Sequence, residues 1–390
     1  MKKQNKLRLF KRDEPAKKSL FGAGVGNSEY QRKYNDMANT KLGKNKHQRL
    51  KKVLLIILCV ILAIVLIIGS TFAYLYYSGK GQFLNENPEI AIPADVAQSN
   101  GNKVENEGIT YVYDEDVTTI LCIGVDKDEN TQIKTEEYGA AGQADALYLA
   151  CIDNDEKKYT VLSINRDSMI DVDTYTTGGT YNGIKKMQAC LSFAYGDGKE
   201  ESCENTKKAI SRLLYNIPIN SYFSINKASI PLLNDIIDGV DVPVYDNEGN
   251  VTGDIEHLSG KEAYDYIHYR DIKKLDSNLV RLKRQTSYIK AFASKLIAKT
   301  KSNLSTPLEI FETVSIYSTT DLNASKITYL TTNAFSDRND IQIDFKSVPG
   351  KVIEGEGGYA EYVVDSNALL QVVLDIFYDK LDEPASTTKK

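Results

Sequence analysis

The chain has 390 residues, with 48 Lys and Arg against 53 Asp and Glu, and its formal net charge of −5 is the sum of two opposite parts. Residues 1–52 carry 16 basic and 4 acidic side chains, or +12, which leaves 32 basic and 49 acidic side chains, or −17, for residues 53–390. With three histidines in all, a His-rich zinc centre and an HExxH protease are excluded. The sequence contains neither GxxxxGK[ST] nor GxSxG, which disfavours a phosphate-loop NTPase and a hydrolase with a nucleophile elbow.

The first predicted element is a membrane-spanning helix over residues 53–77. This stretch runs 25 residues without a charged side chain. As a helix rising 1.5 Å per residue it would span about 37 Å, more than the roughly 30 Å hydrocarbon core of a bilayer. About 50 residues precede it, more than a cleaved signal peptide carries, so we expect a retained signal-anchor. Cleavage after the Ser70–Ala73 region is the alternative.

The basic tail, residues 1–52, predicts the orientation of this helix. Its positive charge, set against an acidic body, places the N-terminus in the cytoplasm and the body outside the cell by the positive-inside rule. The tail also fits contact with anionic lipids better than nucleic-acid binding, because it contains no recognisable nucleic-acid-reading motif. We therefore expect a single-pass protein of the cell membrane that binds no nucleic acid.

Residues 78–115 are rich in Asn, Gly, Pro and Glu without a sustained hydrophobic period, which is typical of an extracellular linker. Beyond it strands and helices alternate over roughly 270 residues, and we expect a layered α/β/α domain with a central mixed sheet, preceded by the one transmembrane helix. The predicted strands are 118–125, 146–152, 159–164, 222–225, 240–244, 341–345 and 361–364. The predicted helices are 187–195, 204–215, 229–237, 261–269, 279–297, 324–332 and 367–381.

Four of the five cysteines lie outside the predicted membrane helix. Cys122 and Cys151 fall in apolar strands, where a free thiol packs as a small hydrophobic group. Cys190 and Cys203 enclose a short loop, and a disulfide between them would stabilise the fold by about 3 kcal/mol on the loop-entropy account. The spacing leaves both the bridged and the free state open.

A basic segment from residue 268 to 290 lies within the acidic body, with seven Lys and Arg against two Asp. Asp276, or the serine after it, is expected to cap the following helix, so that Arg281 falls in the first turn. Arg284 and Gln285 then lie close to the same helix face. Free backbone N–H groups, the helix dipole and these cations together favour a phosphate site. The alternative is a solvated basic helix face.

Charged residues also lie where three predicted strands end or begin. Asp126 closes the first strand, Asp145 opens the second and Arg166 closes the third. If the strands are neighbours, these side chains meet at one edge of the sheet, where α/β folds bind ligands. Carboxylates without a nearby histidine are hard oxygen ligands, suited to Mg²⁺ that keeps waters and bridges phosphate oxygens. Taken singly, each Asp is a plain cap or turn residue.

Seven sequence blocks occur in order along the predicted domain. They are GVDKD (124–128), ADALYLACID (144–153), LSINRDS (162–168), AYGDG (194–198), IPINSYFSIN (217–226), IIDGVDVPV (236–244) and the stretch from YIHYR to RLKRQ (266–285). With the basic tail, the single span and the outer domain, these blocks resemble the LytR-CpsA-Psr family. The resemblance implies a catalytic domain at residues 116–383, followed by a disordered tail at 384–390.

The resemblance implies a cell-envelope transferase that joins a glycopolymer, such as teichoic acid or capsule, to a peptidoglycan hydroxyl through a phosphodiester. The donor would be the glycopolymer carried on undecaprenyl pyrophosphate, which makes the enzyme a phosphotransferase. It is expected to depend on Mg²⁺, with Mn²⁺ as the alternative. By the same resemblance, the metal-linked aspartates fall on Asp126 and Asp145, and the pyrophosphate-binding arginines on Arg166, Arg270 and Arg281.

The resemblance also implies substrate-binding residues, and at one of them the chain departs from the family. Gln285 matches the polar residue after the last arginine, and the family's lysine falls on Lys186, with Lys185 or a shifted register as alternatives. Where the family usually has Arg-x-Arg, the first position here is His268, so one phosphate contact is weaker or depends on pH. Together with the helix-face argument, the predicted substrate-binding residues are Lys186, His268, Arg284 and Gln285.

The implied reaction requires positioning, charge neutralisation and activation of an acceptor hydroxyl. Either of the two aspartates could take the acceptor proton. A polyprenyl tail needs a dry, elongated pocket, which helices over 230–237 and 289–297 could line, although core packing is their default explanation.

Two rival functions stay open at this point. In the first, the domain binds polyprenyl phosphate or glycopolymer without turnover, as the missing first arginine allows. In the second, the chain is a membrane-bound transcriptional regulator whose basic tail contacts nucleic acid.

Overall fold

The computed structural model describes residues 27–83, 90–127, 138–269, 277–336, 341–355 and 357–381. These residues belong to two compact units, the first ending at Thr71 and the second starting at Phe72. The predicted phosphate-binding Arg270, the predicted cap Asp276 and the predicted disordered tail at 384–390 lie outside the described residues.

Helix α1 (Asn27–Gln82) contains the predicted membrane segment. From Leu50 to Gln82 it is long and apolar enough to cross a membrane by length and composition, and its most apolar window has a mean hydropathy of 3.4 with no part buried. A helix of this kind is typical of a single-pass membrane protein. The structure therefore agrees with the span predicted over residues 53–77.

The second unit is built on a six-stranded mixed sheet with the order β12-β9-β4-β5-β6-β13. Strand β4 is parallel to β9 and antiparallel to β5, and β6 is parallel to β13. The mixed sheet confirms the predicted fold class. The strands are β4 (Val117–Val125), β5 (Ala144–Asp153), β6 (Tyr159–Ile164), β9 (Ser221–Asn226), β12 (Ser318–Thr320) and β13 (Ile343–Ser347).

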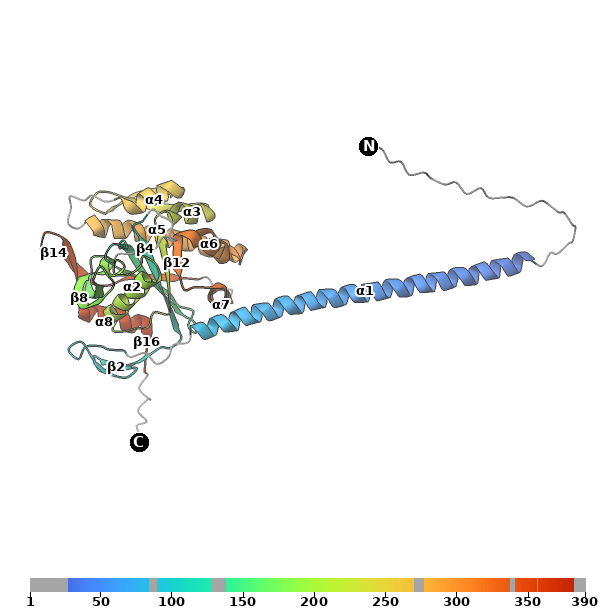
Figure 1. Cartoon of the computed structure of the whole chain (residues 1–390), viewed down its shortest axis with the longest axis horizontal. Helices are drawn as coiled ribbons and strands as arrows, with labels where there is room; N and C mark the ends of the chain where they lie inside the picture. Colours follow the sequence, from blue (N-terminus) through green and yellow to red (C-terminus); the bar gives the residue numbers. More distant parts are fainter. Residues whose placement is uncertain are drawn as a thin grey trace, which may run out of the picture. The chain divides into compact units, whose positions relative to one another are not determined.

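Helices lie on both faces of this sheet (Figure 1). Apolar residues that alternate along β4 and β5, such as Leu121 and Leu147, share one core with Ile210 of α2 and Val373 of α8. The opposite face looks towards α3, α4, α5 and α6. The helices are α2 (Glu200–Leu213), α3 (Ser229–Ile236), α4 (Gly260–His268), α5 (Ser277–Ser302), α6 (Thr306–Val314), α7 (Ala324–Ala334) and α8 (Ser366–Phe377).

The segment predicted as a linker, residues 78–115, is folded where the structure describes it, and this prediction is corrected. Helix α1 runs on to Gln82, and three short strands pair with β16 in a four-stranded sheet. Val104 and Tyr111 of these strands are buried in the main core. Because these strands are short and polar on their outer faces, their alternation of apolar and polar residues is too brief to be recognised in the sequence. The strands are β1 (Gln98–Asn100), β2 (Lys103–Asn106), β3 (Ile109–Tyr113) and β16 (Tyr378–Lys380).

Two predicted helices are also corrected. The one at 367–381 ends at Phe377, because the next residues pair with β3. The one at 187–195 is the end of a strand followed by a single 3₁₀ turn, since the N–H groups of Ala189 and Cys190 bond to the carbonyls of Ser168 and Arg166. The remaining strands form hairpins, which are β7 (Met169–Tyr175) with β8 (Tyr181–Gln188), β10 (Val240–Tyr245) with β11 (Val251–Leu258), and β14 (Gly350–Glu354) with β15 (Ala360–Val364).

Candidate functional site

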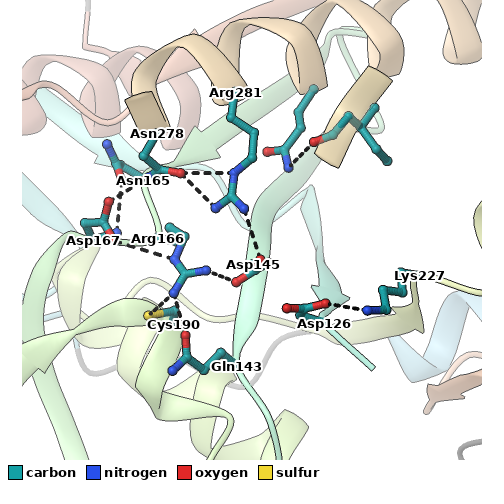
Figure 2. Close-up of polar contacts among 12 residues, drawn as sticks. Asp126, Gln143, Asp145, Asn165, Arg166, Asp167, Cys190, Lys227, Asn278 and Arg281 are labelled. Carbon is teal, nitrogen blue, oxygen red and sulfur yellow. Dashed lines mark hydrogen bonds and ion pairs between the residues drawn. The ribbon is translucent and has the colours of Figure 1, made fainter. Parts of the chain in front are cut away.

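The three charged residues predicted at strand ends lie at one edge of the sheet. Because β4, β5 and β6 are antiparallel neighbours, the end of β4, the start of β5 and the end of β6 meet there. Asp145 joins two arginines, since Arg166 Nη1 bonds to its Oδ1 and Arg281 Nη1 lies 3.1 Å from its Oδ2 (Figure 2). The sequence prediction that these residues cluster is confirmed for all three.

A β-bulge turns Asp145 towards the helices α3 to α6. The register between β4 and β5 shifts at Gly124 and Val125, which leaves Asp145 as the extra residue of β5. By simple alternation Asp145 would face the core with Leu147, two residues on. Instead Asp145 and Ala146 both line a cavity on the opposite face. The bulge therefore places the Asp145 carboxylate on the cavity face of the sheet, where regular alternation would not put it.

Arg281 is held in place by a buried amide. Arg281 is 5% exposed, and its Nε and Nη2 donate to Asn278 Oδ1 over 3.2 and 2.8 Å. Asn278 Nδ2 in turn donates to Asn165 Oδ1 at 3.1 Å and Asp167 Oδ2 at 2.7 Å. The described part of helix α5 runs from Ser277, four residues before Arg281. This network holds the guanidinium in one orientation before any ligand arrives.

Arg166 is fixed in a similar way. Its Nη2 donates to Gln143 Oε1 at 2.5 Å and to Cys190 Sγ at 3.3 Å, and its Nε lies 3.5 Å from Asp167 Oδ1. Cys190 and Cys203 are both free thiols, so the bridge that the spacing left open is absent. Burial raises the pKa of the Cys190 thiol, which therefore contacts Arg166 as a neutral group.

Asp126 has a cationic partner that the sequence reasoning missed. Strands β4 and β9 are parallel and their last paired residues are Val125 and Asn226, so the next residue of each strand, Asp126 and Lys227, emerges at the same edge. Lys227 Nζ lies 3.0 Å from Asp126 Oδ1 (Figure 2). The available signal was the position of Lys227 two residues after the predicted strand 222–225, close to the kind of strand-end position that marked Asp126.

An apolar cavity of about 410 Å³ lies between the sheet and helices α3, α4, α5 and α6. Small residues on β4 and β5, including Gly124 and Ala150, leave the space. Both predicted pocket helices contribute to the wall, for example through Ile230 and Phe292. At the sheet edge the lining turns polar, with Asp126, Asp145, Lys227, His268 and Gln285. The site is therefore amphiphilic, with a charged end and an apolar body.

His268 and Gln285, two of the predicted substrate-binding residues, both line this cavity. Gln285 is buried and donates its Nε2 to the Ile267 carbonyl at 3.4 Å. His268 Nδ1 lies 2.8 Å from the Tyr264 carbonyl oxygen, and its ring stacks on Tyr264 with centroids 4.1 Å apart. Burial lowers the pKa of His268 below its usual 6.5, so the imidazole is neutral at pH 7 and Nδ1–H is the donor.

Two predicted substrate-binding residues do not join the cluster. Arg284 turns to Tyr269, donating Nη2 to its carbonyl oxygen at 2.8 Å with the guanidinium 4.9 Å from the ring centroid. Lys186 is an exposed residue of β8, opposite Asp171 in the hairpin. Neither lines the cavity. Lys186 precedes the helix expected at 187–195 and lies in β8. Arg284 is directed to Tyr269 by its hydrogen bond to the carbonyl oxygen and its contact with the ring.

The carboxylates at the sheet edge fit a divalent cation only if the ion has further ligands. Among the described residues, no group of three or more His, Cys, Asp and Glu is arranged to hold a metal. Asp126 and Asp145 both offer hard oxygen ligands to the same cavity, and Mg²⁺ is commonly held by one or two carboxylates with waters and substrate phosphates as the remaining ligands. The pair therefore suits an ion that is shared with a phosphate.

A family model described as LytR_cpsA_psr matches residues 86–375 of this chain. The chain belongs to the LytR_cpsA_psr family. This confirms the resemblance drawn from the seven sequence blocks.

Curated relatives of this LytR_cpsA_psr chain carry a functional name. The chain is 25% identical over 335 residues to the polyisoprenyl-teichoic acid–peptidoglycan teichoic acid transferase TagU of Enterococcus faecalis, which covers 83% of this chain and 95% of the relative. It is 27% identical over 262 residues to the protein of the same name from Oceanobacillus iheyensis, covering 63% of this chain and 72% of the relative.

The fold of this LytR_cpsA_psr chain is shared with a solved structure. The crystal structure of B. subtilis TagV superposes with a TM-score of 0.52 at 20% sequence identity, covering 67% of this chain and 96% of TagV. The likeness concerns the fold.

Proposed function

We propose that this protein transfers a glycopolymer from an undecaprenyl-pyrophosphate carrier to a peptidoglycan hydroxyl, forming a phosphodiester. The observation that carries the proposal is the amphiphilic site, an apolar cavity of about 410 Å³ that ends at a cluster of fixed charges. A polyprenyl chain requires a dry, apolar volume, and a pyrophosphate requires cations at one end of it. The functional name of the curated relatives supports the same reaction.

The cations of the cluster would bind the pyrophosphate. Arg166 and Arg281 approach Asp145 from two different elements and are each held by neutral partners, so their guanidinium groups are oriented in advance. A guanidinium matches two phosphate oxygens at once. Arg270 is proposed to complete this set, on the strength of the family resemblance.

Bond changes in the proposed reaction follow from its reactants. The acceptor hydroxyl oxygen attacks the phosphorus that carries the first sugar, and the P–O bond to the lipid phosphate breaks, leaving its electron pair on that phosphate. The hydroxyl proton passes to Asp126 or Asp145. These two residues would also hold Mg²⁺, with Mn²⁺ as the alternative, and such an ion supplies positive charge beside the departing phosphate.

The proposed topology brings the site to its substrates. With the basic tail inside the cell and the acidic domain outside, the domain is tethered to the membrane that carries the lipid-linked donor and faces the cell wall. Protection of the domain from protease added to intact cells, which would show the reverse orientation, would contradict the proposal.

The experiment that tests the function is a transfer assay with full-length protein, a lipid-pyrophosphate-linked glycopolymer and peptidoglycan. Arg281→Ala should lower the transfer rate by at least about 30-fold, because loss of a buried charged contact costs on the order of 2–5 kcal/mol and about 1.4 kcal/mol corresponds to tenfold. Lys283→Ala is the matched control, since Lys283 lies on the same helix but bonds to the Gly249 carbonyl. Transfer at the wild-type rate by a folded Arg281→Ala protein would refute the assignment.

A second candidate function is a binding module that holds the lipid-linked polymer without turnover. The observation that favours it is the neutral, stacked state of His268 at the polar end of the cavity, which offers a phosphate less charge than an arginine would. The same assay separates the two functions. A donor that binds but is never consumed, with Mg²⁺ and acceptor present, would support the binding module.

A further inference from the structure

Lys227 lies where the proposed divalent cation would bind. Its ammonium nitrogen is 3.0 Å from Asp126 Oδ1, and its side chain lines the polar end of the cavity. The parallel pairing of β4 and β9 up to Val125 and Asn226 sets both residues at the same edge. The contact is therefore a consequence of the sheet and not of a chance surface rotamer.

The ion pair is unevenly buried. The Lys227 side chain is 18% exposed, whereas that of Asp126 is 49% exposed. A lysine drawn into a partly buried position beside an apolar cavity needs a compensating charge, and Asp126 supplies it. An ordinary surface pair would leave both ends in water and contribute little. The more open side of Asp126 stays accessible to a second cation.

Both carboxylates of the proposed metal site already have cationic partners within the chain. Asp145 contacts Arg166 and Arg281, and Asp126 contacts Lys227. A divalent ion bound to this pair would have to approach these cations or displace one of them. Lys227 differs from the two arginines because its charge is a compact ammonium on a flexible stem, whereas each guanidinium is a planar group bonded to an amide side chain.

We propose that Lys227 is a built-in counter-ion that occupies Asp126 and weakens the binding of divalent cations to the site. The ammonium and the metal ion then compete for one carboxylate. This inference rests on the proposed function for the place of the metal, but it concerns binding alone and needs no turnover. Its test can therefore succeed or fail independently of the transfer assay.

The test measures Mn²⁺ binding to the full-length protein in detergent micelles by calorimetry, with no lipid or acceptor added. Lys227→Met should bind Mn²⁺ about tenfold more tightly than wild type, since removing a positive charge a few ångströms from the ion removes both repulsion and competition. Lys227→Arg keeps the charge and should bind as wild type does. Lys295→Met removes the cation of an exposed pair with Asp241 and should change nothing.

A further variant ties the effect to Asp126. In the double variant Lys227→Met with Asp126→Asn, the gain in Mn²⁺ affinity should disappear. Binding by Lys227→Met where wild type shows none would also support the proposal. Equal affinities in wild type and Lys227→Met, no binding by either protein, or a gain that survives Asp126→Asn would overturn it.

Discussion

The two faces of the central sheet are made by the same strands but differ in how they are filled. On one face Leu121, Leu147 and Leu149 are fully buried against α2 and α8. On the other face Gly124 and Ala150 leave a cavity of about 410 Å³ under α3 to α6. Protein interiors normally contain few voids larger than a water molecule. The closed face therefore stabilises the fold, and the open face is shaped for a ligand.

The largest effect should come from the closed face. Leu149→Ala should lower the free energy of unfolding by about 2–5 kcal/mol, because it removes buried methyl groups and leaves a void in a packed core. Denaturant unfolding of the full-length protein measures it. Leu149→Met, which keeps the volume, should cost less than about 1.5 kcal/mol. A Leu149→Ala protein as stable as wild type would contradict the claim that this face of the sheet is a packed core.

The neighbouring residue on the open face should behave in the opposite way. Ala150→Leu places added methyl groups in the cavity, so the free energy of unfolding should change by less than about 1.5 kcal/mol. Binding of a fluorescent isoprenyl pyrophosphate should weaken by at least about tenfold, since the apolar chain loses its volume. Unchanged probe binding by a folded Ala150→Leu protein would mean that the cavity does not hold the apolar chain.

The polar end of the open face should respond to pH through His268. Its pKa is lowered by burial and by Arg281 and Lys227, while Asp126 and the Tyr264 carbonyl act in the opposite sense. As pH falls below that lowered pKa the ring gains a positive charge, so an anionic probe should bind several-fold more tightly than it does at pH 7.

His268→Gln provides the control for this pH effect. The ionisation of the probe itself is common to both proteins, so the difference between their affinity profiles isolates His268. Parallel profiles for wild type and His268→Gln between pH 7 and pH 5 would exclude a role for the imidazole.

The smallest effect is expected near the edge of the closed face. Burial and the nearby Asp153 and Asp379 raise the pKa of Asp114 to about 6. The folded state then holds a proton more tightly than the unfolded state, so stability falls as pH rises from about 4 to 6. Asp114→Asn should raise the melting temperature at pH 7 by a few degrees at most, and this gain should shrink towards pH 4. If Asp114→Asn melted at a lower temperature than wild type at pH 7, the raised pKa of Asp114 would be contradicted.

Much of the site follows from sequence because it lies at strand ends. Asp126, Asp145 and Arg166 flank short apolar runs, and adjacent strands bring such ends together. The apolar wall from α3 and α5 was also predicted, since helices with long apolar faces cover a sheet.

The remaining features depend on tertiary register. The bulge that turns Asp145 to the cavity breaks the period-two pattern, and no local residue type announces it. The hydrogen bond from Asn278, which holds Arg281, to Asp167 joins residues 111 positions apart along the chain. Lys227 has its partner only because β9 pairs with β4 in parallel. Such pairings are set by the whole fold and not by neighbours in sequence.

The central claim is that the cavity holds the polyprenyl chain of a pyrophosphate-linked donor. Native mass spectrometry of full-length protein, purified from membranes in mild detergent, tests it most directly. We expect wild-type protein to carry a polyprenyl phosphate or pyrophosphate, and Ala150→Leu protein to lose it while staying folded. Wild-type protein that carries no such lipid and takes up none when it is added, or equal lipid occupancy in both proteins, would contradict the account.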